Sequence, residues 1–173
     1  MQTKKHGLAP VAGELPEILI LGSLPGDESL RLQQYYGNPR NMFWKVLEKV
    51  FEEPVPVDYE SRKSFLMAHK IALWDIFAAA ERNGSLDSNI INEEYNDILG
   101  LLESNSSIKT IVLNGGKAAK SFARYLRAHR FDFEEIRVLP FTSTSAMSLS
   151  AGWTLDRIAG QWKTMLPVCY QHL

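Results

Sequence analysis

Four short apolar runs of this 173-residue chain are each followed by a polar or glycine-rich segment. The four segments are residues 23–26, Asp75, residues 114–117 and residues 140–146. Hydroxyl, amide and carboxyl groups hydrogen-bond a polar ligand, and glycines let the backbone approach that ligand closely. If the runs are strands that end at one edge of a sheet, these segments predict a site for an uncharged or weakly charged polar ligand near a phosphate.

The apolar runs themselves predict four strands, at residues 17–22, 71–74, 110–113 and 135–139. Each run is continuously apolar rather than alternating, which is typical of strands covered on both faces. Ligands of such parallel sheets bind beyond the carboxyl ends of the strands, where the polar segments lie.

Helical patterns separate these strands, and they cover residues 43–51, 95–102, about 116–130 and 154–166. We expect Asn38 to cap the first helix and Pro39 to occupy its first turn. The alternation of strand and helix predicts an α/β fold, a three-layer α/β/α sandwich around a central, mostly parallel four-stranded sheet.

Length and composition favour one domain over residues 1–173, with residues 1–16 as a loosely ordered N-terminal segment. The only cysteine, Cys169, excludes a disulfide framework and a cysteine-rich metal site. No apolar run approaches the length of a membrane helix, and the N-terminal residues lack a secretory pattern. We therefore expect a soluble intracellular protein. The net charge of −1 argues neither for nor against nucleic acid.

The segments GSLPG (residues 22–26) and YYGNPRNMFW (residues 35–44) resemble the first motif of the uracil-DNA glycosylase superfamily. They are most similar to the hypoxanthine (deoxyinosine) DNA glycosylase branch and more distantly to mismatch-specific uracil/thymine glycosylases. The resemblance spans about residues 17–166 and includes LWD with GSLDS, NGGKA and LPFTS. It implies a monofunctional DNA glycosylase that flips out and excises a deaminated base, hypoxanthine or uracil, without metal or cofactor.

Two positions depart from the common superfamily pattern. Leu24 stands where many members have an Asn, Asp or Glu that directs the attacking water, and the second motif at residues 143–145 has neither His nor Pro. The deoxyinosine branch implies that the catalytic amide is Asn41 instead. The alternatives are a catalytically inactive nucleic-acid or nucleotide-binding module and a flavodoxin-like small-molecule binder. The aromatic segment at residues 35–44 argues against the latter.

The resemblance implies a set of site residues. Asn41 orients water, while the hydroxyls of Ser143 or Ser145 and backbone N–H groups stabilise the leaving base. The residues expected to contact the base are Ser23, Leu24, Tyr36, Phe43, Trp74, Asp75 and Asn114. Those expected to contact DNA are Gly26, Arg40, Lys117 and Met147.

Three of these residues have ordinary structural alternatives. Asn41 could begin a helix, Asp75 could cap a helix that opens at Ile76, and Asn114 beside two glycines could form a turn. At least two of the aromatic residues between Tyr35 and Trp44 are expected in the core.

The DNA-contacting residues also have alternatives. The Lys and Arg stripe of residues 117–127 is either a solvated face or a phosphate track. Met147 and Leu149 are either packed core or a wedge that fills the gap left by an extruded base. The expected partner is DNA that contains a deaminated base, bound by a monomer in the cytoplasm and at the nucleoid, with no membrane involved.

Overall fold

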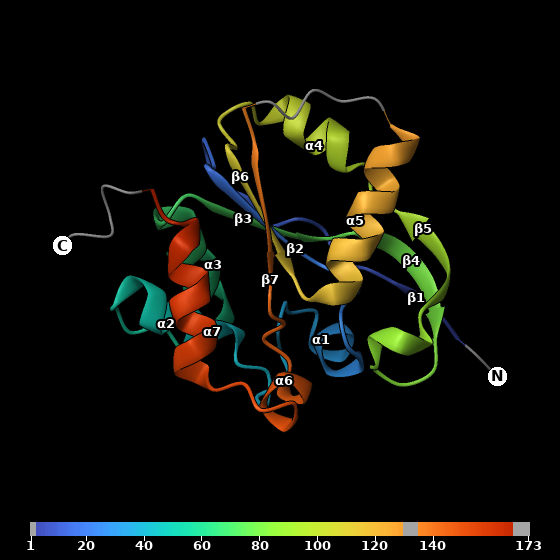
Figure 1. Cartoon of the computed structure of the whole chain (residues 1–173), viewed down its shortest axis with the longest axis horizontal. Helices are drawn as coiled ribbons and strands as arrows, with labels where there is room; N and C mark the ends of the chain where they lie inside the picture. Colours follow the sequence, from blue (N-terminus) through green and yellow to red (C-terminus); the bar gives the residue numbers. More distant parts are fainter. Residues whose placement is uncertain (1–2, 130–134, 168–173) are drawn as a thin grey trace.

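The computed structural model of the chain describes residues 3–129 and 135–167, so that Arg130 and Cys169 lie outside the described residues. Its centre is a four-stranded parallel sheet with the order β3-β2-β6-β7 (Figure 1). The strands are β2 Ile18–Gly22, β3 Ile71–Asp75, β6 Thr110–Asn114 and β7 Arg137–Phe141. The first three predicted strands are confirmed within one residue. The last begins and ends two residues later than predicted and holds Pro140, which an edge strand tolerates.

The register of this sheet brings the polar segments together. Gly22 lies opposite Asp75, and Asn114 lies opposite Phe141. Because all the pairs are parallel, the carboxyl ends of the four strands meet at one edge.

Alternate side chains of β2 enter two different cores. Ile18 and Ile20 pack with α2 Phe43–Phe51, α3 Tyr59–Ala68 and α7 Leu155–Trp162. Leu19 and Leu21 pack on the opposite face with α4 Ile98–Ser104 and α5 Gly116–Ala128. The two groups of helices lie on opposite sides of the sheet in Figure 1. The three-layer α/β/α sandwich is confirmed.

A second sheet, with the order β1-β4-β5, was not predicted. Its antiparallel strands are β1 Thr3–His6, β4 Phe77–Arg82 and β5 Ile91–Tyr95. The sequence pattern carries no clear signal for it, because β4 is rich in alanine and β5 is polar and largely exposed. The short helix η1 Asp87–Asn89 lies between β4 and β5.

The prediction that residues 1–16 are loosely ordered is wrong for the described part of that segment. β1 pairs with β4, and Val11 exchanges two backbone hydrogen bonds with Leu73, at 2.9 and 2.8 Å. The Val11 side chain is buried in the core. These contacts hold the N-terminal segment against the body of the protein.

Three predictions about helix ends are revised by the structure. Neither Asn38 nor Pro39 starts α2, because residues 38–41 form a turn and the helix begins only at Phe43. Tyr95 belongs to β5, and α4 begins at Ile98. Thr154 does cap α7, since its hydroxyl accepts the N–H of Arg157.

The remaining short helices are α1 Asp27–Leu32, α6 Ala146–Ser150 and η2 Lys163–Met165. Both α1 and α6 lie beyond the carboxyl edge of the parallel sheet (Figure 1). Across the residues described, none of the helices has the length and apolar character needed to cross a membrane.

We predict that Val11→Ala lowers the free energy of unfolding by about 1–2 kcal/mol, because it removes buried methyl groups. Val57→Ala is the matched control: Val57 is 90% exposed, and its loss should change stability by less than about 0.5 kcal/mol. Chemical denaturation of both variants tests this. Equal effects of the two substitutions would show that the N-terminal segment is not packed on the core.

Candidate active site

A cavity of about 670 Å³ lies at the carboxyl edge of the parallel sheet. Its walls come from the ends of β2, β3 and β6 and from residues 35–41, 85–87 and 143–153. Twelve of the fourteen predicted site residues line it, and the exceptions are Phe43 and Trp74. Segments far apart in sequence therefore meet where the strand ends predicted a ligand site.

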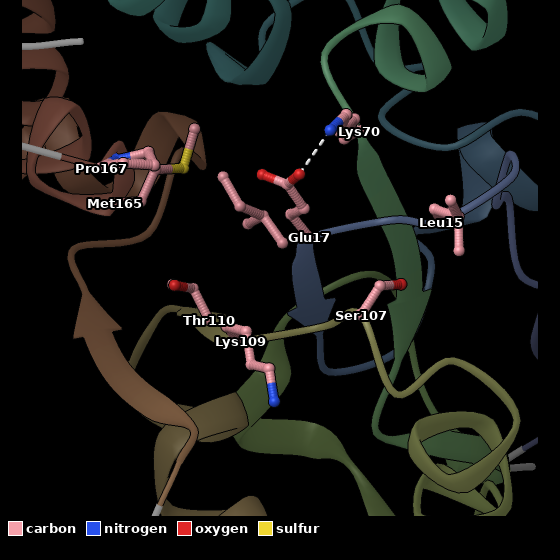
Figure 2. A pocket seen from close by; sticks show the side chains of 9 residues that line it. Leu15, Glu17, Lys70, Ser107, Lys109, Thr110, Met165 and Pro167 are labelled. Atoms are coloured by element: carbon pink, nitrogen blue, oxygen red, sulfur yellow. Dashed lines mark hydrogen bonds and ion pairs between the residues drawn. The ribbon is translucent and has the colours of Figure 1, made fainter. Parts of the chain in front are cut away.

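A second, smaller cavity of about 320 Å³ lies at the opposite edge of the sheet (Figure 2). It is lined in part by Glu17, Lys70 and Lys109, and Lys70 forms an ion pair with Glu17 at 2.5 Å. None of the predicted site residues lines this cavity.

The predictions that Phe43 and Trp74 contact the base are wrong. Phe43 is fully buried under Tyr36, with ring centroids 3.8 Å apart and planes inclined by 13°. Trp74 donates its indole N–H to the carbonyl of Leu8 at 3.1 Å, away from the pocket. Successive strand residues point to opposite faces, so Trp74 cannot accompany Asp75 into the site. Of the two stacked rings, Tyr36 is the one that lines the pocket.

Asp75 forms part of the pocket floor and is only 4% exposed. Its carboxyl lies against Gly22 of β2, where a Cβ atom would clash with Oδ1. Its Oδ2 atom is buried and has no hydrogen-bond partner among the described residues. The alternative of a helix cap is wrong, since the chain continues from Asp75 into β4.

The surroundings of Asp75 favour its neutral form. Burial, followed by the negative charge of Asp87, raises the pKa of Asp75 from 3.8 to about 7, against the opposing charge of Arg82. This carboxyl therefore exchanges a proton near neutral pH, and it can donate as well as accept a hydrogen bond.

Asn114 ties the aromatic wall to the second motif. Its Nδ2 donates to Tyr36 Oη at 2.8 Å and to Thr144 Oγ1 at 3.0 Å, and its Oδ1 accepts the N–H of Thr144 at 3.0 Å. The amide is thus a buried network centre rather than a simple turn former. Burial raises the pKa of Tyr36, so its hydroxyl stays protonated.

Asn41 is held in a fixed orientation at the pocket wall. Its Oδ1 accepts the N–H of Phe43 at 2.9 Å, so the residue does organise the start of α2, as the structural alternative supposed. A carbonyl oxygen has two lone pairs, and the second one can accept a hydrogen bond from water. The adjacent N–H of Met42 donates to the carbonyl of Thr144 at 2.8 Å and joins this wall to the second motif.

The serines of the second motif are also organised by local contacts. Ser143 Oγ accepts the N–H of Ser145 at 3.1 Å, which leaves its own proton available to a ligand. Gly115 has φ +103°, and a Cβ atom there would approach Ser143 to 2.9 Å. A glycine at this position permits the close approach of the two strand ends.

Leu24 brings no polar side chain to the site. It is buried and packs in the core beneath α4 and α5, so only its backbone is available to a ligand. The neighbouring Ser23 donates to Asp87 Oδ1 at 2.7 Å. Asp87 lines the pocket but was not predicted as a site residue, although it stands in the GSLDS segment.

The DNA-contacting candidates lie in different environments. Lys117 pairs with Glu93 at 2.8 Å, and Arg124 lies 3.8 Å from the same carboxylate, so the stripe meets an acid supplied by β5. Met147 is 61% exposed and Leu149 46% exposed, which excludes the packed-core alternative. Their role as a wedge stays a prediction. In the part of the chain that is described, no three His, Cys, Asp or Glu residues form a group able to hold a metal ion.

The chain is thus an α/β/α sandwich with a polar, carboxyl-containing pocket at the carboxyl ends of its parallel strands, which is where ligands of such folds bind. Residues 11–163 match the model of the family described as the uracil DNA glycosylase superfamily, and the chain belongs to this superfamily.

Two relatives are named hypoxanthine DNA glycosylase. The protein from Methanosarcina acetivorans is 44% identical over 140 residues, which cover 80% of this chain and 86% of the relative. The protein from Methanosarcina barkeri is 39% identical over 155 residues, covering 87% and 96%. A solution NMR structure of a candidate uracil DNA glycosylase from M. acetivorans matches with a TM-score of 0.79 and 37% identity, covering 94% of this chain and 96% of that one.

The raised pKa of Asp75 predicts a specific dependence of stability on pH. The folded protein holds this proton more tightly than the unfolded chain, so the contribution is fully present below pH 3.8 and is lost as the pH rises through about 7. Relative to Asp75→Asn, the wild-type protein should therefore lose up to about 4 kcal/mol across this interval.

Denaturant unfolding of both proteins at several pH values measures this difference. Asp58→Asn is the contrasting control, because the hydrogen bond from Ser61 lowers the pKa of Asp58 and its contribution is lost as the pH falls. A difference between wild type and Asp75→Asn that does not change with pH would contradict the assignment.

Proposed function

We propose that this chain is a monofunctional DNA repair glycosylase that hydrolyses the N-glycosidic bond of a deaminated base, with hypoxanthine as the first substrate and uracil as the second. One observation carries the proposal: Asn41, Tyr36 and Asp75 meet in one pocket of a chain that belongs to the uracil DNA glycosylase superfamily. The names of the two relatives support the choice of hypoxanthine.

The target base must leave the double helix to reach this pocket. Tyr36, supported from behind by Phe43, supplies an aromatic wall for the extruded base. Met147 projects from α6 beside the pocket and is suited to fill the gap in the duplex. Arg40 and the backbone at Gly26 lie at the same pocket and are suited to phosphate contacts.

Bond cleavage leaves positive charge on the sugar and negative charge on the departing base. Asn41 holds the attacking water through the free lone pair of Oδ1, while its contact with Phe43 fixes the amide. An amide is a weak base, so its contribution is orientation. The Ser143 hydroxyl and the backbone near Ser23 and Leu24 stabilise the base as it leaves.

Asp75 reads the base through either of its protonation states. As a neutral acid it donates to the carbonyl oxygen of hypoxanthine or uracil, and as a carboxylate it accepts the neighbouring ring N–H. We further propose that the protein acts as a monomer in the intracellular compartment that contains DNA.

The proposal is tested with labelled duplexes that carry hypoxanthine, uracil, xanthine or only normal bases. After incubation and alkali treatment, strand cleavage at hypoxanthine with no cleavage of the normal duplex is expected. Tight binding without cleavage would instead support the inactive DNA-binding module, for which the apolar Leu24 is the supporting feature.

We predict that Asn41→Ala lowers the single-turnover excision rate by more than about tenfold with little change in DNA affinity, because it removes the group that orients water. Asn105→Ala is the matched control: its amide also makes a local contact, donating to the carbonyl of Leu101, but it does not line the pocket. Retention of more than about a tenth of the rate by Asn41→Ala would remove Asn41 from catalysis.

We also predict that Asp75 sets the preference among bases. In Asp75→Asn the ratio of hypoxanthine to uracil excision should change about tenfold or more, since a mispaired polar contact in a buried pocket costs about 1–3 kcal/mol. In the wild type this ratio should itself change between about pH 6 and about pH 8, and in the variant it should not. An equal fall of both rates in the variant would contradict a role in base selection.

A further inference from the structure

Arg82, the last residue of β4, is a buried cation beside the pocket that does not line it. It is only 1% exposed. Its Nε donates to the carbonyl of Gly84 at 3.0 Å, its Nη1 to the carbonyl of Leu24 at 3.3 Å, and its Nη2 to the carbonyl of Pro25. No Asp or Glu of the described residues forms an ion pair with it.

A buried guanidinium is costly unless its N–H groups find acceptors, so the three carbonyls are strongly constrained to face it. The planar fork of arginine allows one side chain to serve acceptors on two separate segments. Arg82 therefore joins the turn of the first motif to the loop that follows β4.

The orientation of these carbonyls determines where the adjacent N–H groups point. In a trans peptide the C=O and N–H bonds point in opposite directions, so the N–H groups of Gly26 and Ser85 face away from Arg82. Gly26, Ser85 and Asp87 all line the pocket. Two further hydrogen bonds connect the same two segments: Ser85 Oγ accepts the N–H of Asp27 at 3.0 Å, and the Ser23 hydroxyl donates to Asp87.

We propose that Arg82 is a positioning residue that holds the first-motif turn (residues 23–26) and the loop at residues 84–87 in the geometry needed for base excision. It acts through these two segments and does not itself touch the base. The activity tests of this inference rest on the proposed glycosylase function.

Arg82 also contributes to the electrostatics of the pocket floor. Its positive charge lowers the pKa of both Asp75 and Asp87, and so opposes the effect of burial. Tyr35 and Tyr36 lie close enough to Asp75 to respond to its charge, and Lys117 acts on Asp87. Loss of the Arg82 charge should therefore raise the pKa of Asp75 further.

The test compares Arg82→Met and Arg82→Lys with the wild-type protein. Arg82→Met removes the charge and all three hydrogen bonds, whereas Arg82→Lys keeps the charge but cannot reproduce the planar fork. On hypoxanthine-containing duplex, Arg82→Met should lower the single-turnover rate about tenfold or more and change DNA affinity less than about threefold. The midpoint of the pH dependence of excision should shift to higher pH. Arg82→Lys should be intermediate in rate, with the pH dependence near that of the wild type.

Arg62→Met is the matched control. Arg62 is a half-buried arginine that donates to the carbonyl of Pro56 and packs over Trp44, away from the pocket. Its loss should affect stability without affecting the rate of the folded protein.

Amide hydrogen exchange provides a readout that does not depend on activity. Exchange in residues 23–28 and 84–89 should accelerate in Arg82→Met and not in Arg62→Met. If the wild type excises no base while this exchange pattern appears, the proposed function fails, but the exchange still shows that Arg82 holds the two segments in place. Wild-type rates and exchange in folded Arg82→Met would overturn the inference, as would failure of both Arg82 variants to fold.

Discussion

The parallel pairing of Gly22 with Asp75 is the constraint on which the pocket depends. β2 lies between β3 and β6, so Gly22 stands at the middle of the carboxyl edge. Because Gly22 has no side chain, the Asp75 carboxyl can lie over it and become buried, and Oδ2 has no hydrogen-bond partner within the described part of the chain. Burial raises the pKa of this carboxyl to about 7, so the pocket contains a group that gains or loses a proton near neutral pH.

Two other networks keep the walls of the pocket at a fixed distance from this carboxyl. Asn114 connects the hydroxyl of Tyr36 to Thr144, which places the aromatic wall against the second motif. Arg82 connects the first-motif turn to the loop that carries Asp87. Removing a partner from either network leaves a buried polar group unpaired, which costs folding free energy. Both networks therefore favour one arrangement of the site over others.

The sequence predicts the parallel sheet and the place of the pocket well, because buried strands read as continuous apolar runs and their ends must share one edge. The same reasoning places Asp75 and Asn114 at this edge, but their residue types alone leave Asp75 open between a helix cap and a base contact and favour a turn for Asn114. Asn41 comes from the resemblance, since its residue type and position alone favour an ordinary helix start. Phe43 lies on the apolar face that predicts α2, so the helical pattern itself favours its burial. The orientation of Trp74 is not predicted, because a continuously apolar strand does not show which of its residues face the site. Arg82 and Asp87 are not predicted, because Arg82 ends β4 and Asp87 lies between β4 and β5, two strands of the antiparallel sheet that the sequence pattern does not indicate.

The pocket floor holds a buried carboxyl, Asp75, that is expected to titrate near neutral pH. Carbon-13 NMR of the labelled Asp75 side chain, assigned by comparison with Asp75→Asn, measures this directly in the folded protein without substrate. We expect a titration midpoint of about 7 for this carboxyl, because burial raises its pKa. A midpoint near the ordinary aspartate value of about 3.9 would contradict it, because the carboxyl would then be solvated and permanently ionised in the pocket.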